Sequence, residues 1–273
     1  MISGATKLTA VLGWPVDHSR SPQIMNAAFA AAAIDAVMIP IGVTAEGFAA
    51  AVAGLRAMHA LGASITVPHK VAAAALCDEL SPAAKAIGAV NCLHVDGDRL
   101  VGHNTDEGGF LDGLTAAGFD LRGKRCVLLG AGGAARAVAY ALRGARAVEI
   151  IARNPAEVAW ARAWPWTAEQ LCECFGRADL VVDCTSMGLG GPAEEEYAAQ
   201  LPLDALAKAV WVTTLVYHRP TILLERAKAA GYFTLDGRAM LVHQASRAFT
   251  IWTGVPAPVD AMTRALEDAL AGT

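Results

Sequence analysis

The chain has 273 residues, of which 55% are hydrophobic and 18% charged, and its formal net charge at pH 7 is −4. This size and composition predict a globular protein with two modest domains. The basic residues are dispersed and no apolar run approaches the roughly 18 residues of a membrane span, so we expect neither nucleic-acid binding nor membrane insertion. The first thirteen residues lack the features of an export signal, which predicts a cytoplasmic protein.

The first half of the chain alternates between strand and helix patterns. This alternation predicts an α/β domain that ends near Asn104. Its last feature is a hairpin around Asp96-Gly97-Asp98, formed by residues 89–95 and 99–102. The preceding strands are predicted at 7–12, 36–41 and 63–67, and the helices at 22–33, 45–59 and 70–77.

Two serines stand where the first helix is predicted to begin. Ser21 precedes Pro22, and this order is typical of a helix N-cap followed by the first helical residue. Ser19 adds a second hydroxyl. Two interpretations stay open: a plain helix cap, and a site where hydroxyls and free backbone N–H groups bind a carboxylate.

A lysine in the first domain and an aspartate at the predicted domain junction lie in two separate loops. Lys70 follows a predicted strand behind Pro68, which restricts the loop. Asp106 ends the polar turn 102–106 at the predicted domain junction. Taken alone, Lys70 is typical of a surface lysine and the turn of a helix cap. The functional alternative is an acid/base pair, in which the carboxylate faces the lysine in a cleft between domains.

A glycine-rich segment follows the strand predicted at 126–129 and opens an alanine-rich helix. Gly130 permits a sharp turn, Gly132 leaves room for a pyrophosphate, and Ala135 lets the helix pack closely on the sheet. A strand predicted at 148–151 completes a βαβ unit. An ordinary tight strand–helix turn is the alternative to a dinucleotide site. The predicted cofactor-binding residues here are Gly130, Ala131, Gly132, Gly133, Ala134 and Ala135.

The residues after the second strand indicate which dinucleotide is bound. An arginine at this place suits the 2′-phosphate of NADP, whereas an acidic residue suits the 2′-hydroxyl of NAD. Arg153 offers a forked guanidinium and Asn154 a further donor, so we predict NADP over NAD. A merely solvated Arg153 is one alternative. Binding of NAD through Glu157 is the other.

The remaining pattern completes a two-domain organisation. Further strands are predicted at 179–183 and 210–216, followed by amphipathic helices at 239–253 and 259–271 that return to the first domain. We therefore predict a substrate-binding and catalytic α/β domain at 1–104 plus 237–273. Residues 105–236 are predicted to form a Rossmann-like, doubly wound dinucleotide-binding domain.

Cysteine and histidine spacing argues against a metal centre. The chain has 6 cysteines and 7 histidines, without a C-x-x-C pair and without histidines at ligand spacing. We therefore expect reduced core thiols and no structural metal.

Several ordered motifs resemble those of the shikimate dehydrogenase family over nearly the whole chain. They include Gly-x-Pro-x-x-His-Ser-x-Ser-Pro at 13–22, Thr-x-Pro-His-Lys at 66–70, Gly-Ala-Val-Asn at 88–91, Asn-Thr-Asp at 104–106, the glycine-rich segment at 130–135 and Met-Leu-Val-x-Gln at 240–244.

The resemblance implies specific roles for residues in these motifs. Proton transfer falls to Lys70 and Asp106. Ser19 and Ser21 hold the carboxylate of the substrate. The ring hydroxyls of the substrate, and its carboxylate as well, are bound by Thr66, Asn91 and Gln244. By the same resemblance Gly237 and Met240 lie beside the nicotinamide, and Tyr217 lies at the substrate edge of the cofactor domain.

Three departures from the family pattern concern the substrate and the cofactor. Ser64 stands where the family usually has a substrate-contacting asparagine. Thr214 replaces an aspartate, and the segment from Tyr217 to Thr221 is one residue short. The family's Asn-Arg-Thr cofactor clamp is Ala152-Arg153-Asn154.

Together these observations predict an NADP-dependent oxidoreductase that interconverts 3-dehydroshikimate and shikimate, acting as a monomer or homodimer. An NAD-linked quinate/shikimate dehydrogenase, or a paralogue with another substrate, is an alternative within the family. A catalytically silent NADP- or shikimate-binding sensor is the alternative from another class. Retention of both Lys70 and Asp106 argues against the sensor, because a pure binder needs no proton donor.

Overall fold

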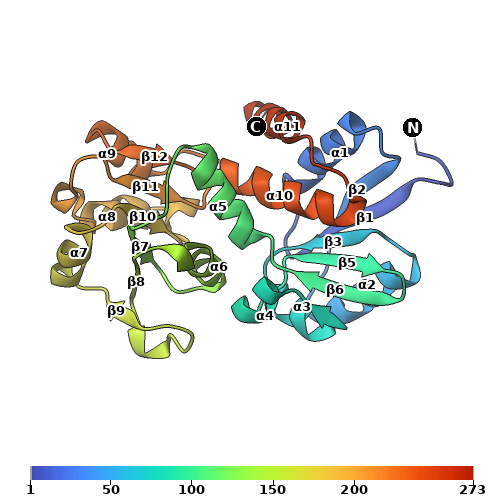
Figure 1. Cartoon of the computed structure of the whole chain (residues 1–273), viewed down its shortest axis with the longest axis horizontal. Helices are drawn as coiled ribbons and strands as arrows, with labels where there is room; N and C mark the ends of the chain where they lie inside the picture. The colour runs from blue at the N-terminus through green and yellow to red at the C-terminus, as the bar shows by residue number, and fades with distance from the viewer. Residues whose placement is uncertain (1, 273) are drawn as a thin grey trace. The chain divides into compact units, whose positions relative to one another are not determined.

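The computed structural model describes residues 2–272 and divides into two compact units (Figure 1). One unit contains the residues up to Gly109 together with those from Val242 onward, and the other contains Phe110–Leu241. Each unit is built on its own six-stranded sheet covered by helices. This is the α/β architecture that the strand–helix alternation predicts.

The sheet of the first unit mixes parallel and antiparallel pairs. Its strands are β1 (Lys7–Gly13), β2 (Ala36–Gly42), β3 (Gly62–Ile65), β4 (Glu79–Leu80), β5 (Cys92–Asp96) and β6 (Arg99–His103). The strand order is β2-β1-β3-β5-β6-β4, in which β1 pairs in parallel with β2 and β3, and β5 pairs antiparallel with β3 and β6. Gly97 turns the β5–β6 hairpin with φ of +60°, a conformation that glycine adopts without strain.

Helices cover this sheet, and α1 (Ser21–Ala31) lies beside α11 (Val259–Ala271) at the chain's C-terminal end (Figure 1). The predicted N-cap role of Ser21 is wrong: Arg20 occupies the N-cap and Ser21 is the first helical residue. The helix starts earlier because Arg20 itself has helical φ and ψ and its carbonyl accepts the Ile24 N–H. The other helices of this unit are α2 (Phe48–Ala57), α3 (Lys70–Leu76) and α4 (Pro82–Ile87). Helices α5 (Asp106–Ala116) and α10 (Arg238–Thr253) contain the positions at which the two units divide.

The sheet of the second unit is entirely parallel. Its strands are β7 (Arg125–Leu129), β8 (Ala147–Ala152), β9 (Ala163–Pro165), β10 (Leu180–Asp183), β11 (Trp211–Thr214) and β12 (Phe233–Leu235). The order is β12-β11-β10-β7-β8-β9, with helical connections between most neighbours. The central strands β7 and β10 are buried runs rich in valine and leucine, as expected for a parallel sheet covered on both faces.

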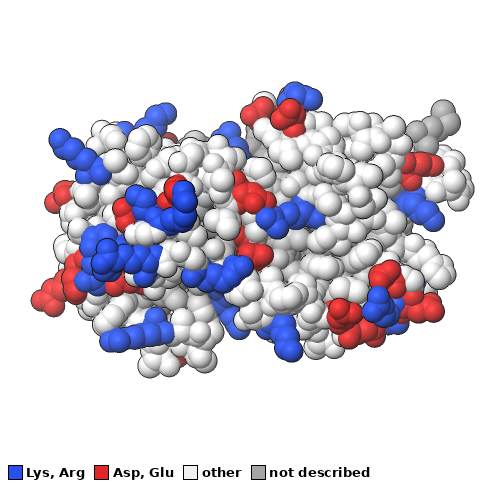
Figure 2. Space-filling view, viewed as in Figure 1, with Lys and Arg blue, Asp and Glu red and all other residues white. Residues whose placement is uncertain are grey.

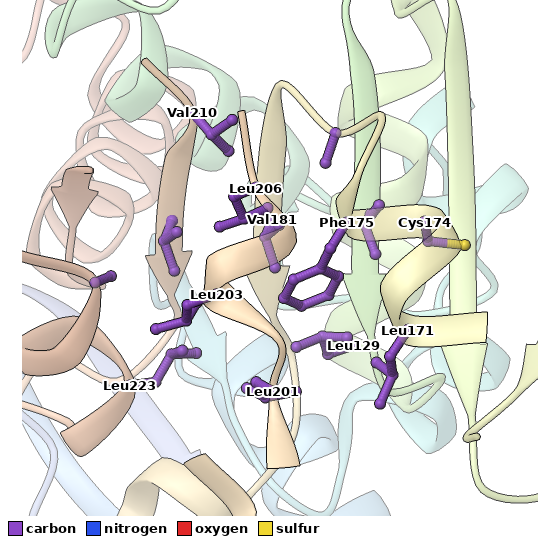
Figure 3. Packing of buried hydrophobic residues seen from close by; sticks show 14 of the residues in the cluster. Leu129, Leu171, Cys174, Phe175, Val181, Leu201, Leu203, Leu206, Val210 and Leu223 are labelled. Carbon is purple, nitrogen blue, oxygen red and sulfur yellow. The ribbon is translucent and has the colours of Figure 1, made fainter. Parts of the chain in front are cut away.

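The helices of this unit are α6 (Gly133–Ala141), α7 (Ala168–Phe175), α8 (Ala193–Gln200) and α9 (Ile222–Ala229), with 3₁₀ turns at η1 (Leu142–Gly144), η2 (Pro155–Glu157), η3 (Met187–Leu189) and η4 (Leu203–Ala205). One core is centred on Phe175, which is fully buried (Figure 3). It packs with apolar side chains from β7, α7 and β10, among them Leu129, Leu171 and Val181.

Acidic and basic side chains are interspersed on the face shown in Figure 2, and much of that face carries neither. Within residues 2–272, no helix is both long and apolar enough to cross a membrane.

Candidate active site

Lys70 occupies a fixed position at the first residue of α3. The preceding residue, His69, is buried and stacks on Phe48 with ring centroids 4.3 Å apart. Its Nε2 lies 2.6 Å from the Val43 carbonyl oxygen, and Val90 N–H donates to the Lys70 carbonyl. The backbone of Lys70 is therefore held from both sides.

Lys70 and Asp106 form an ion pair within the first unit. Lys70 Nζ lies 2.6 Å from Asp106 Oδ2, and the two side chains are 33% and 11% exposed. The contact unites the ends of two sequence motifs that are 36 positions apart. A short, partly desolvated pair of this kind is stronger than a solvated surface pair. It places an ammonium proton next to a carboxylate that orients it.

Asn91 connects the residues around this pair. Its amide nitrogen lies 2.9 Å from both Thr105 Oγ1 and Asp106 Oδ1, and 3.4 Å from Gln244 Oε1. Its Oδ1 accepts the Thr105 N–H at 2.6 Å. The structure thus brings together four of the predicted motifs in one hydrogen-bond network. Sequence reasoning missed this joint role, because spacing does not reveal which buried amide links distant loops.

The other polar residues predicted in this unit lie on neighbouring segments. Ser19 Oγ accepts the Ser21 N–H at 3.3 Å, and both serines are half-buried at the start of α1. Ser64 is buried in β3, and Thr66 follows that strand, with its methyl group next to Gly13. Within residues 2–272, none of these four side chains hydrogen-bonds to Lys70 or Asp106.

The glycine-rich segment of the second unit has the geometry of a phosphate-binding turn. Gly130 leaves β7 with φ of +94°, a conformation that favours glycine. The positions where a Cβ would stand on Gly132 and Gly133 are open, and both residues are exposed. Helix α6 begins here without a side-chain cap or an acidic residue in its first turn. Its exposed N-terminus therefore suits a pyrophosphate. Ala135 is fully buried against the core.

The residues predicted to contact the ribose of the cofactor follow β8 directly. Gly130 N–H donates to the Ile151 carbonyl at 2.8 Å, so the glycine turn starts beside the end of β8. Arg153 and Asn154 come next, and both are exposed. Asn154 Nδ2 donates to Glu157 Oε2 at 3.3 Å, while Arg153 forms no ion pair with the described residues. Its guanidinium is therefore available to an external phosphate.

The remaining predicted residues of the second unit gather after β11. Gly237 N–H donates to the Val216 carbonyl at 2.9 Å, next to Tyr217. A Cβ on Gly237 would stand 2.2 Å from the Leu215 carbonyl oxygen, so only glycine permits this approach. Met240 is partly buried in the core that includes α6. Thr214 is buried at the end of β11 and its hydroxyl accepts the Val216 N–H at 3.3 Å.

A buried acid that sequence reasoning missed ends β10. Asp183 is 1% exposed, and its Oδ1 accepts hydrogen bonds from Thr185 N–H at 2.9 Å and Tyr197 Oη at 3.0 Å. Burial raises the pKa of this carboxyl group, because desolvation outweighs the hydrogen bonds. A lone aspartate at a strand end carries no sequence signal of this environment.

We expect Asp183→Asn to stabilise the protein at alkaline pH. A carboxyl whose folded pKa lies above its unfolded value of about 3.9 contributes stability below that value and loses it as the pH rises through the folded pKa. The neutral amide keeps the acceptor and can donate to the Thr185 hydroxyl. The midpoint of thermal unfolding should therefore rise by about 2–4 °C at pH 8, which corresponds to a gain of about 1 kcal/mol in the free energy of unfolding. The rise should be smaller at pH 4.5. Equal gains at both pH values would contradict this, and Asp204→Asn, at an exposed aspartate, is the control.

The six cysteines are all free, but not all of them lie in the predicted core environment. Cys92, Cys126 and Cys174 are buried, Cys77 and Cys184 are partly buried, and Cys172 is exposed. Burial raises the pKa of the Cys126 thiol to about 12, so this thiol stays protonated near neutral pH. Within the described part of the chain, no three acidic, histidine or cysteine side chains gather as a metal cluster would require.

A surface cavity of about 570 Å³ lies elsewhere in the second unit. It is lined by residues of α7, η4 and α9, including Cys172, Asp204 and Arg226. None of the predicted site residues lines it.

Comparison with known proteins identifies the family. The model of the shikimate dehydrogenase substrate-binding domain matches residues 11–93, and that of the shikimate 5′-dehydrogenase C-terminal domain matches residues 237–267. Shikimate dehydrogenase (NADP(+)) of Moorella thermoacetica is 42% identical over 285 aligned positions, which cover 98% of this chain and 95% of that protein. The chain belongs to the shikimate dehydrogenase family. The resemblance seen in the sequence motifs is thereby confirmed.

Solved members of the shikimate dehydrogenase fold superpose on nearly the whole chain. The Thermus thermophilus enzyme in complex with NADP(H) and shikimate is 37% identical, with a TM-score of 0.84, and covers 97% of this chain and 100% of that one. Quinate dehydrogenase from Corynebacterium glutamicum in complex with NAD is 30% identical, with a TM-score of 0.83, covering 96% and 99%. A 5-ketofructose reductase of Gluconobacter sp. strain CHM43 is 32% identical, with a TM-score of 0.85, covering 98% and 100%. The fold therefore serves more than one substrate.

Proposed function

We propose that this protein is an NADP-dependent shikimate dehydrogenase, which interconverts 3-dehydroshikimate and shikimate. The observation that carries the proposal is the 2.6 Å ion pair between Lys70 and Asp106, held in a network with Asn91 and Gln244. A proton donor and an orienting carboxylate are what the reduction of a ketone to an alcohol requires of the protein. The relatives' names supply the substrate and the cofactor.

In the reductive direction, a hydride adds to the carbonyl carbon and a proton adds to its oxygen. NADPH supplies the hydride when it is bound. The Lys70 ammonium donates the proton to the forming alkoxide, while Asp106 orients that ammonium through Oδ2. Lys70 then regains a proton from solvent, to which its side chain is 33% exposed. In the oxidative direction Lys70 first releases one ammonium proton to solvent, and the resulting amine then accepts the proton of the alcohol.

Further residues of the first unit would bind the rest of the substrate. The proposal assigns the carboxylate to the hydroxyls of Ser19 and Ser21, and the ring hydroxyls and carboxylate to Thr66, Asn91 and Gln244. The position of Ser19 directly before the half-buried N-terminus of α1 supports the carboxylate assignment. Ser64 offers a shorter side chain than the asparagine usual at this position, so we propose that it binds a ring hydroxyl weakly.

The two units would divide the work between substrate and cofactor. Residues 1–104 with 237–273 would form the substrate-binding and catalytic domain, and residues 105–236 the dinucleotide-binding domain. Asp106, two residues past the first boundary, belongs to the same compact unit as Lys70. The open glycine turn and the exposed Arg153 support the second assignment. In this proposal Gly237 and Met240 lie beside the nicotinamide, and Tyr217 lies at the edge nearest the substrate.

A panel of two cofactors against two substrates tests this proposal. We expect the purified protein to oxidise shikimate with NADP more efficiently than any other combination of shikimate or quinate with NADP or NAD. The absorbance of the reduced nicotinamide reports each rate. Better turnover of quinate with NAD would favour the activity named for the Corynebacterium relative. Binding of NADP without turnover of either substrate would favour the sensor.

The variant Ser64→Asn serves as the internal comparison in the same panel. A longer amide that reaches a ring hydroxyl should lower the shikimate KM about threefold to tenfold while kcat changes little, as expected when a contact is equally strong in ground and transition states. A higher shikimate KM, or a lower KM for quinate alone, would contradict the proposal that Ser64 binds a ring hydroxyl of shikimate weakly.

A further inference from the structure

An unusually short connection joins two parallel strands beside the glycine turn. Strands β8 and β9 pair in parallel, yet only residues 153–162 lie between them and their one helical element is the 3₁₀ turn η2. Parallel neighbours usually need a connection of a dozen or more residues that contains an α-helix. The apolar face of the sheet that such a helix would shield from solvent must therefore be shielded by other side chains.

Trp160 supplies part of this cover. It lies in the short connection and is partly buried in the core that includes Val138 of α6 and Val148 and Ile150 of β8. Its indole N–H also donates a hydrogen bond of 3.3 Å to the carbonyl oxygen of Ala131, inside the glycine turn. One side chain thus both packs on the sheet and holds the turn.

This hydrogen bond determines where the next N–H group points. The carbonyl of Ala131 and the N–H of Gly132 belong to the same peptide unit, which is trans. In a trans peptide the two groups point in opposite directions. Because the carbonyl is directed at Trp160, the Gly132 N–H is directed away from it, on an exposed residue where the space for a Cβ is open.

We propose that Trp160 is a positioning residue for cofactor binding, which aims the Gly132 N–H at the pyrophosphate by holding the Ala131 carbonyl. A hydrogen bond to the carbonyl also polarises the peptide unit and strengthens its N–H as a donor. The inference rests on the proposed binding of NADP. It adds a residue of the short connection that touches neither the substrate nor the reacting atoms.

The test separates the pyrophosphate from the 2′-phosphate. We expect Trp160→Phe, which removes the donor, to raise the Kd of NADP and of NAD by the same factor, about threefold to tenfold for one lost hydrogen bond. The Kd of adenosine 2′-monophosphate, which lacks a pyrophosphate, should change less than twofold. Titration calorimetry with the full-length protein measures all three, and kcat at saturating NADP should stay within about twofold.

Two further proteins make the result decisive. Trp164→Phe removes a nearby half-buried tryptophan whose ring stacks under Arg162 at 4.2 Å, and it should leave all three Kd values unchanged. Replacement of Trp160 by 3-benzothienylalanine keeps the ring size but removes the N–H. It should raise the Kd of NADP and of NAD as expected for Trp160→Phe, and it provides the test if Trp160→Phe does not fold. Unchanged NADP binding in this protein, or an equal loss for adenosine 2′-monophosphate, overturns the inference. No NADP binding by the unmodified protein overturns the proposed function as well.

Discussion

Replacement of Lys70 by alanine should lower kcat for shikimate oxidation by about 10²–10⁴-fold, the usual worth of positioned proton transfer. The loss should fall on kcat, because a proton donor acts mainly in the transition state. The shikimate KM should rise only several-fold, since the proposed hydroxyl and carboxylate contacts of Ser19, Ser21 and Thr66 remain. Steady-state kinetics with saturating NADP measures both constants.

The control for this experiment is Lys85→Ala, at an exposed lysine on α4 of the same unit. It should leave kcat and KM unchanged. A Lys70→Ala protein that folds normally and keeps kcat within a few-fold of the parent would show that the ion pair with Asp106 is structural. The same substitution leaves Asp106 without its cation, so thermal unfolding must be measured alongside activity.

Replacement of Arg153 by alanine should reduce kcat/KM with NADP by about 10–100-fold, since a charge-assisted hydrogen bond to a phosphate dianion contributes about 1.5–3 kcal/mol. With NAD, which carries a hydroxyl at this place, the same constant should change less than threefold. The loss should appear in the KM for the cofactor. Measurement of both cofactors on both proteins gives the change in preference directly.

Arg162→Ala is the matched control, because this arginine is also exposed and lies on the same connection, but it stacks on Trp164. It should not alter the preference between NADP and NAD. If the unmodified protein uses NAD more efficiently than NADP, Glu157 is the better candidate for the residue that contacts the ribose. Its carboxylate already accepts a hydrogen bond from Asn154 at 3.3 Å and so lies at this edge.

The longer helices and the apolar runs follow from the sequence, because a helix of several turns shows its period and a continuous apolar run indicates a buried strand. The runs at 7–12 and 126–129 are strands, and the predicted helix at 259–271 is observed with the same bounds. The glycine turn was also predictable, because Gly130 adopts the positive φ that its place after a strand requires. In these cases local residue preferences are sufficient to predict the element.

The short elements were missed for the same physical reason. Strands β4, β9 and β12 are two or three residues long, too short to display alternation, and α4 has six residues. The helix predicted at 45–59 begins only at Phe48, since alanine richness extends the helical pattern into a turn. Within the site, the Lys70–Asp106 pair was anticipated, but the links made by Asn91 depend on side chains that meet only after folding.

The hydrogen bonds of Asn91 make the two oxygens of Asp106 inequivalent before any substrate arrives. Because Asn91 Oδ1 accepts the Thr105 N–H, the amide cannot rotate by half a turn without losing that bond, and its NH₂ group stays directed at Asp106 Oδ1. Lys70 is then left with Oδ2. One oxygen of the carboxylate, Oδ1, therefore accepts from Asn91, and the other, Oδ2, accepts from Lys70. In the reaction proposed above, the substrate oxygen would meet an ammonium group whose direction is already set in the folded protein, so little reorganisation would remain for the reaction itself.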